Sequence, residues 1–291
     1  YSSLYNLLYC YEQLEKNEEA IQVLNEILEI DPYSEIAWHQ LGLVLLKKGL
    51  LKEALSAFDF AIISDDTFTG AYIEKAKLLE GVGRVNEAIS NYEIALNTND
   101  PSAFVYQSIG TCHEKLGNLE LARQFYLKAI HIEPSNENSW ERIISFYTEQ
   151  GNFKKAKDYF KRALDVNSDS ILLWEKGIEI YEGLKDDKRA LQACQKIYDL
   201  GAYEFSYLIK HIDFHLKFQQ WDEAFRLTKE AFENFEDNPQ VINRMGGCCL
   251  ELGRLSEATY FLKFKSMSEE EYSKLQQLFP SLADFKKGES V

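Results

Sequence analysis

The sequence predicts an all-α fold, an α-solenoid of tandem helix-turn-helix repeats that ends in a capping helix. Three observations support this fold class. Apolar residues recur at helical spacing, as in Leu4, Leu7, Leu8 and Tyr11. A turn glycine lies five residues before the repeated alanine in five of the repeats, for example Gly117 before Ala122. That alanine recurs every 34 residues without insertion or deletion, at Ala20, Ala54, Ala88, Ala122, Ala156, Ala190, Ala224 and Ala258.

Each 34-residue unit is predicted to contain two amphipathic helices joined by a short turn. All five prolines fall between predicted helices, where the missing N–H is tolerated. We expect residues 269–291 to form a capping helix and tail, because three glutamates near the start of this helix suit its dipole and an open array needs its last face covered. We see no corresponding cap at Tyr1 and expect more repeats or another domain before it. The eight units cover residues 1–34, 35–68, 69–102, 103–136, 137–170, 171–204, 205–238 and 239–268.

The 34-residue unit, with its recurring alanine and turn glycine, resembles the repeat of the tetratricopeptide repeat family. That family has a Trp, Leu-Gly, Tyr, Ala, aromatic, Ala, Pro pattern. The resemblance covers residues 1 to about 268 and implies a right-handed superhelix. It also implies a concave groove, lined by the first helix of each repeat, that holds a partner segment. Unit 171–204 departs most, because Lys176 and Gly177 disturb the Leu-Gly step and Cys194 replaces the aromatic. Unit 103–136 carries the pattern as Tyr106, Ile109, Gly110, His113, Ala122, Tyr126, Ala129 and Pro134.

Composition narrows the possible functions. Hydrophobic residues make up 45% of the 291 residues, which is enough for a buried core. The 32 basic and 47 acidic residues give a net charge of −15, which disfavours nucleic acid as a partner. No apolar run reaches the roughly 18 residues that a membrane span needs. We therefore expect a protein or peptide partner.

Two histidines four residues apart, His211 and His215, have the spacing at which a helix can direct two imidazoles to one zinc ion. In the repeat register, however, His211 takes the position of Leu41 and Ile109, and His215 takes that of tyrosines. No clear further ligand follows from the register, although Cys194 or Cys249 could lie near. We expect packed histidines rather than a metal site.

The five cysteines contain no C-x-x-C pair. Cys10, Cys112 and Cys248 share the repeat position of Val44, so we expect small buried thiols in a reducing, cytoplasmic compartment. The candidate histidines and cysteines lie mostly on packing positions of the repeat, so they form no Ser-His-Asp or Cys-His catalytic arrangement. The sequence therefore gives no case for an enzyme or a cofactor in this segment.

The predicted concave positions of the first three repeats are nearly free of charge, although these repeats hold more acidic than basic residues. Only Glu74 and Lys77 are charged there. Contiguous apolar and aromatic surface is typical of a binding site. The competing interpretation is that some of these residues pack between neighbouring first helices or are covered by repeats upstream of Tyr1. The candidate partner-binding residues are Tyr5, Tyr9, Ile36, His39, Leu43, Ile73 and Phe104.

A second candidate is a row of four basic residues at the sixth position of repeats 5 to 8: Arg142, Lys176, Lys210 and Arg244. The row could bind an acidic segment. Alternatively, it is neutralised by the acidic residues predicted on the same face, which are Glu141, Glu175, Glu179 and Asp213. In the resembling family, some members bind chaperone C-terminal tails through a clamp of Lys, Asn and Arg. That combination is absent in register here, so chaperone tails are disfavoured.

The sequence thus favours a protein-interaction scaffold that binds a partner segment in its groove. Two alternatives stay open. The chain could be the regulatory or substrate-recruiting region of a larger enzyme whose catalytic domain lies elsewhere, or it could be a self-association module.

Overall fold

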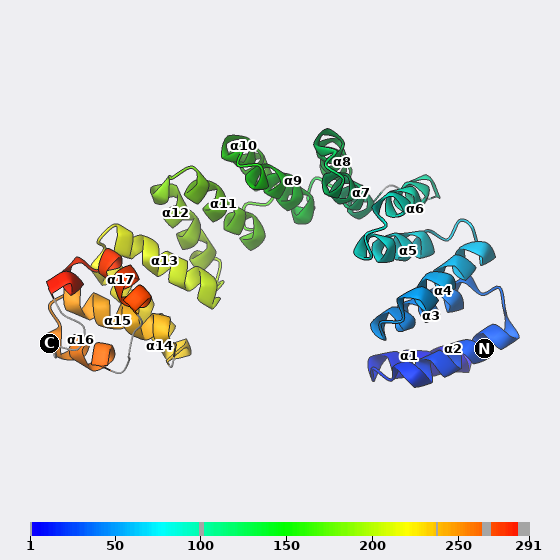
Figure 1. Ribbon diagram of the computed structural model, residues 1–291, viewed down its shortest axis with the longest axis horizontal. Coiled ribbons are helices and arrows are strands. Elements are labelled where there is room, and N and C mark those ends of the chain that lie inside the picture. The colour runs from blue at the N-terminus through cyan, green and yellow to red at the C-terminus, as the bar shows by residue number, and fades with distance from the viewer. Residues whose placement is uncertain (1, 99–101, 237, 264–268, 285–291) are drawn as a thin grey trace. The chain divides into compact units, whose positions relative to one another are not determined.

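The computed structural model describes residues 2–98, 102–236, 238–263 and 269–284, and within them every regular element is helical (Figure 1). This confirms the predicted all-α fold class. The elements are α1 (Ser2–Gln13), α2 (Asn17–Ile30), α3 (Glu35–Lys47), α4 (Leu51–Ser64), α5 (Thr69–Gly81), α6 (Val85–Thr98), α7 (Ala103–Lys115), α8 (Leu119–Ile132), α9 (Glu137–Glu149), α10 (Phe153–Leu164), α11 (Ile171–Gly183), α12 (Asp187–Asp199), α13 (Phe205–Lys217), α14 (Trp221–Asn234), α15 (Pro239–Glu251), α16 (Leu255–Lys263), α17 (Glu269–Leu278) and the 3₁₀ helix η1 (Pro280–Asp284).

The turn inside each helix pair has one fixed backbone feature. Its fifteenth repeat position adopts a positive φ, which lets the chain reverse between the two helices. Five of the eight residues there are glycines, the residue type for which this conformation is easiest, as at Gly49 with φ 75°. The other three are Glu15, Lys185 and Gln219, with φ between 54° and 57°. The turn geometry is therefore kept where the glycine signal is lost from the sequence.

The chain divides into two compact units, Tyr1–Ile143 and Ile144–Val291. In the first unit, the second helix of each pair packs against the first helix of the next. Ala88 and Tyr92 of α6 share a buried cluster with Ile109 and Cys112 of α7. In the same way, Ala54 and Phe58 of α4 meet Leu78 of α5. The repeated alanine is small because two helices approach closely at this point.

Glycines on the first helices lie against aromatic rings. A Cβ added at Gly110 would lie 2.6 Å from Cε1 of Tyr126, the aromatic residue of the same repeat. In the second unit, a Cβ at Gly177 would lie 2.7 Å from Cζ of Phe160, which belongs to the preceding repeat. Unit 171–204, which departs most from the repeat pattern, therefore also has a glycine packed against an aromatic ring. Here the ring comes from the preceding repeat instead of from the same repeat.

The segment after the last helix pair covers the core of the second unit. Leu275, Phe279 and Leu282 are buried in one cluster with residues of α13, α14 and α15. The backbone amide and the hydroxyl of Ser281 both donate to the Glu251 carboxylate, at 2.7 and 2.9 Å. This packing is that of a capping element. Residues 285–291 of the predicted tail, and 264–268 of the last predicted repeat, lie outside the described residues. None of the described helices is both long and apolar enough to cross a bilayer.

Candidate partner-binding surfaces

The first helices of the first unit carry exposed apolar side chains. Tyr9 of α1 is 63% exposed, Ile36 of α3 is 47% exposed, and Phe104 of α7 is 43% exposed. Together with the half-buried Leu43 and Ile73, these residues form what we call the apolar first-helix surface. All five come from the set that the sequence nominated, and each is placed by the first helix of its repeat.

Three nominated residues also belong to the core. Leu43 packs against the cluster of Ala54 and Phe58, and Ile73 packs against that of α6 and α7. Tyr5 packs against the α1–α2 core, and its hydroxyl lies 3.4 Å from Oγ of Ser34. These side chains therefore fill the gaps between helices as well as facing outward, so their replacement is expected to cost stability.

His39 is held by aromatic neighbours. Its ring lies edge-on to Phe68, with 5.2 Å between ring centroids, and 5.9 Å from the ring of Phe58. Burial lowers the pKa of His39, opposed by the charge of Glu74 and assisted by that of Lys77. The imidazole is therefore neutral at pH 7 and acts as an aromatic packing group.

The two charged residues of this region neutralise each other. Nζ of Lys77 lies 2.7 Å from Oε1 of Glu74 on the same helix. The same ammonium lies 4.9 Å from the centroid of the Phe104 ring, a cation–π distance that links α5 with α7. The surface thus presents little net charge to a ligand.

Arg142, the first member of the basic row, lies in a partly buried network of the first unit. Its Nη2 donates to Oε2 of Glu114 at 3.1 Å and to the Tyr126 hydroxyl at 3.0 Å. The Tyr126 hydroxyl in turn donates to Glu114 at 2.6 Å. Burial, followed by this bond to a carboxylate, raises the pKa of Tyr126 to about 12. The guanidinium is therefore already engaged.

The other three basic residues lie in the second unit and also have carboxylate partners. Lys176 pairs with Glu179 at 3.1 Å, Lys210 with Glu182 at 3.0 Å, and Arg244 with Asp213 at 2.6 Å. These pairs favour neutralisation over a free basic row. Glu114 and Glu182 were missed from the sequence, although each precedes its basic partner by 28 residues and so lies one repeat back on the adjacent first helix.

Comparison with known proteins agrees with the repeat pattern. A tetratricopeptide repeat family model matches residues 1–34, 105–136 and 139–170. The chain is a tetratricopeptide repeat protein. No curated protein matches it.

Solved structures with the same fold share little sequence with this tetratricopeptide repeat protein. PilW, a type IV pilus biogenesis factor, is 17% identical over 71% of this chain and 96% of its own, with a TM-score of 0.58. PilF of Pseudomonas aeruginosa is 19% identical over 72% of this chain and 95% of its own, with a TM-score of 0.53. A tetratricopeptide repeat protein of Parabacteroides merdae is 14% identical over 86% of this chain and 99% of its own, with a TM-score of 0.52. At these identities the likeness shows the fold alone.

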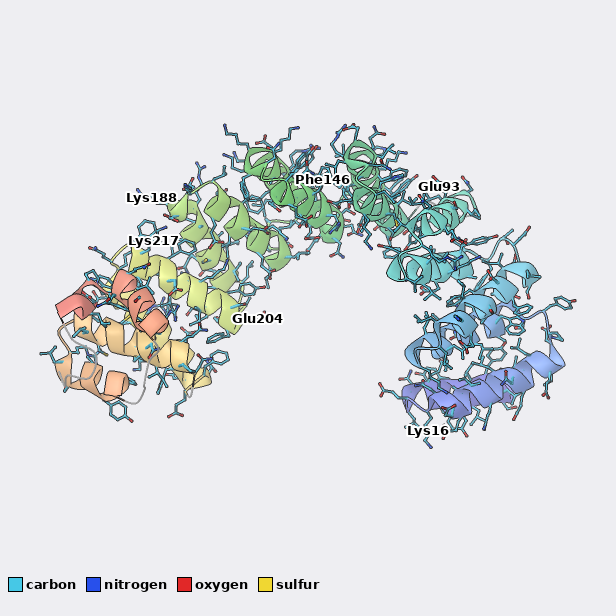
Figure 2. All side chains as sticks on the ribbon, in the orientation of Figure 1. Lys16, Glu93, Phe146, Lys188, Glu204 and Lys217 are labelled. Carbon is cyan, nitrogen blue, oxygen red and sulfur yellow. The ribbon has the colours of Figure 1, made fainter. Side chains whose placement is uncertain are left out.

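A cleft of about 550 Å³ lies beside the capping segment of the second unit. Lys210, Asp213 and Lys217 of α13 line one side, and Leu278 and Pro280 of the capping segment line the other. Figure 2 shows Lys217 on α13 near that segment. Sequence reasoning missed this cleft, because its walls come from helices about 60 residues apart in a tetratricopeptide repeat chain.

The two histidines of α13 are both buried, at 1% exposed for His211 and 8% for His215, which confirms the packing positions read from the register. Their Nε2 atoms lie 3.2 Å apart, and Nδ1 of His215 lies 2.6 Å from Oε1 of Gln220. Within the described residues, no group of three or more His, Cys, Asp or Glu residues is placed to hold a metal ion.

The cysteines are free thiols, and four of the five are buried. The expectation of a buried Cys10 is wrong, because Cys10 is exposed. Its equivalents Val44 and Cys112 are buried by the second helix of the preceding pair. No described helix packs on that side of α1.

Proposed function

We propose that this tetratricopeptide repeat protein is an interaction scaffold that binds a partner segment on its apolar first-helix surface. The proposal is supported by the exposure of Tyr9, Ile36 and Phe104 and by the ion pair in which Glu74 and Lys77 neutralise each other. Tetratricopeptide repeats are in general protein-interaction modules. The division into the eight repeats given above, followed by a cap, and a cytoplasmic location suited to free thiols, are parts of the same proposal.

The partner segment is expected to carry two or three apolar anchors and little net charge. Exposed aromatic side chains provide large contact area at a modest loss of rotamer entropy, so Tyr9 and Phe104 are the strongest candidates for energetic hot spots. Ile36 lies between them in sequence and offers aliphatic contact. The half-buried residues Leu43 and Ile73 would complete the surface without being fully available to the ligand.

The basic row makes a smaller contribution in this proposal. Arg142, Lys176, Lys210 and Arg244 each have a carboxylate within 3.1 Å, so an acidic group of a partner must first displace that carboxylate. We therefore expect the salt dependence of partner affinity to be slight, since few new ion pairs form on binding.

Site-specific photo-crosslinking tests the proposal and identifies the partner together. A photo-reactive phenylalanine analogue is placed at Tyr9 and, as a matched control, at Tyr33, which is 74% exposed in the turn between α2 and α3. Irradiation in native lysate should yield a defined adduct at position 9 that position 33 lacks. The same adducts at both positions, or none at position 9, would count against the surface.

Calorimetry with the recovered partner then measures the contribution of each side chain. Tyr9→Ala, Ile36→Ala and Phe104→Ala should each weaken binding by about 1–3 kcal/mol. Tyr33→Ala should have no effect, and the melting temperatures of all four variants should stay near that of the parent chain. Normal affinity in all three surface variants would contradict the proposal.

A further inference from the structure

Helix α10 is strongly basic, although the chain as a whole has a net charge of −15. It has one acidic residue and five basic ones: Lys154, Lys155, Lys157, Lys161 and Arg162. Lys155 and Arg162 lie over tyrosine rings at cation–π distances of 5.3 and 5.2 Å. Lys154, Lys157 and Lys161 follow one another at spacings of three and four residues, so they lie on one side of the helix. We call these three residues the α10 basic face.

The lysines of the α10 basic face have no counter-charge within the protein. Among the described residues, no carboxylate pairs with Lys154, Lys157 or Lys161. The basic residues of the first helices differ, since Lys176 and Lys210 each have a carboxylate partner. Like charges three and four residues apart repel one another on a helix. A negatively charged ligand would relieve this repulsion, and no carboxylate of the described chain has to be displaced first.

A pocket of about 340 Å³ adjoins the start of α10. Phe153 and Lys154 line it from α10, and Leu184 lines it from the turn after α11. The side chains of Phe153 and Leu184 are both partly exposed. The pocket therefore offers apolar contact directly beside one ammonium of the α10 basic face, with room for one apolar side chain of a ligand.

The positive charge continues into the next repeat of the second unit. Lys188 of α12, labelled in Figure 2, has the repeat position of Lys154, and Lys185 directly follows Leu184 of the pocket. Both lysines are exposed, and neither has a carboxylate partner among the described residues. The basic surface thus extends from α10 toward the start of α12.

The surroundings limit the length of anionic ligand that fits. Helix α10 is about 18 Å long. Exposed carboxylates border its basic face, from Asp158 on α10 and from Asp165 and Asp169 in the turn that follows. A membrane surface or a long nucleic acid strand would bring its phosphates against these carboxylates and against the acidic remainder of the chain. A short acidic segment can contact the lysines without meeting that repulsion.

We propose that the α10 basic face binds a short acidic segment of a partner protein. Its carboxylates pair with Lys154, Lys157 and Lys161, and a neighbouring apolar side chain enters the pocket beside Phe153. The proposal does not rest on the apolar first-helix surface, because the two surfaces share no residue and belong to different units. Salt separates them experimentally, since affinity at the exposed charges of α10 should fall with added salt.

The probe is a fluorescently labelled helical peptide with glutamates three and four residues apart and one leucine a turn beyond them. The intact chain should bind it saturably in fluorescence anisotropy, and affinity should fall at least about tenfold between low salt and about 0.3 M salt. A peptide with glutamine in place of each glutamate should bind at least about tenfold more weakly, because several ion pairs are lost. Serine in place of the leucine should weaken binding about threefold through lost apolar contact.

Two triple variants of the chain test the position of binding. The combination of Lys154→Glu, Lys157→Glu and Lys161→Glu should weaken peptide binding at least about tenfold. The matched control changes three exposed lysines of other helices that also lack a carboxylate partner among the described residues, at Lys47→Glu, Lys52→Glu and Lys229→Glu. It alters the net charge equally and should weaken binding about twofold at most. Both melting temperatures should stay near that of the parent chain, since none of the six side chains is fully buried.

Several outcomes would overturn the proposal. These are the absence of saturable binding, equal affinity in the two triple variants, and equal affinity for the glutamate and glutamine peptides. Equal affinity for the leucine and serine peptides would overturn the role of the pocket. Vesicles of phosphatidylcholine and phosphatidylserine and a single-stranded oligonucleotide are tested in parallel. Tighter binding of either, lost in the α10 variant, would assign the face to that ligand instead. Self-association of the chain that is lost in the same variant would assign it to a second copy.

Discussion

Arg244 on α15 holds Asp213 on α13 through two parallel hydrogen bonds. Nε donates to Oδ1 at 2.6 Å, and Nη2 donates to Oδ2 at 2.7 Å. The side chains are only 12% and 35% exposed, so solvent screens this pair less than an ion pair in open water. The contact joins the first helices of two consecutive repeats of the second unit, across a spacing of 31 residues.

Replacement of Asp213 by alanine should lower the free energy of unfolding by about 1–3 kcal/mol in urea titrations, because the partly buried Arg244 then loses its partner. The matched control is Glu179→Ala, which breaks an i,i+3 pair with Lys176 and should cost at most about 0.5 kcal/mol. The double variant Asp213→Ala with Arg244→Met should recover part of the loss. Equal costs for Asp213→Ala and Glu179→Ala would refute the importance of the bidentate geometry.

The buried histidine pair is expected to make stability depend on pH. Burial, followed by the electrostatic influence of His215 and Arg226, lowers the pKa of His211 to about 4, while Asp199 and Glu223 oppose the shift. The unfolded chain titrates near pH 6.5. Between about pH 6.5 and 4 the unfolded state therefore binds more protons at this residue, and stability falls as the pH falls.

His211→Leu should remove that part of the pH dependence and leave stability at pH 7 equal or higher. In the parent chain Nδ1 of His211 is buried without a hydrogen-bond partner among the described residues, and leucine removes this unsatisfied atom at the cost of the Nε2 contact with His215. Between pH 7 and pH 4, the difference in free energy of unfolding between the two chains should grow by up to roughly 3 kcal/mol. This follows from about 1.36 kcal/mol for each unit of pKa difference. Parallel stability curves for the two chains would contradict this assignment.

The cap is expected to stabilise the second unit through one ring. Phe279 is fully buried, and a Cβ added at Gly247 of α15 would lie 2.5 Å from its Cε2 atom. Phe279→Ala should therefore cost about 3–5 kcal/mol in thermal or urea unfolding. Phe60→Ala, which removes a half-exposed ring stacked on Trp38, should cost clearly less. If Phe279→Ala lowers the free energy of unfolding no more than Phe60→Ala does, the cap contributes little to stability.

The repeated sequence by itself determined the helix pairs. The alanine spacing, the turn glycines and the helical periodicity are local signals. Because they recur from repeat to repeat, the fold class could be predicted without the tertiary structure. The register also placed His211 and His215 among packed residues, as the structure confirms. It nominated Tyr9, Ile36 and Phe104, whose exposure only the structure could establish, and whose binding role remains a proposal.

Tertiary structure alone decided the contacts between repeats. Glu114 and Glu182 neutralise basic residues one repeat later, and the cleft beside Lys217 needs the capping segment as its wall. The register that correctly buried Cys112 failed at Cys10, because burial at that position depends on a neighbouring helix pair and not on the residue itself. Periodicity fixes which side of a helix is apolar, whereas exposure and ion pairing depend on which side chains the adjacent helices bring within contact distance.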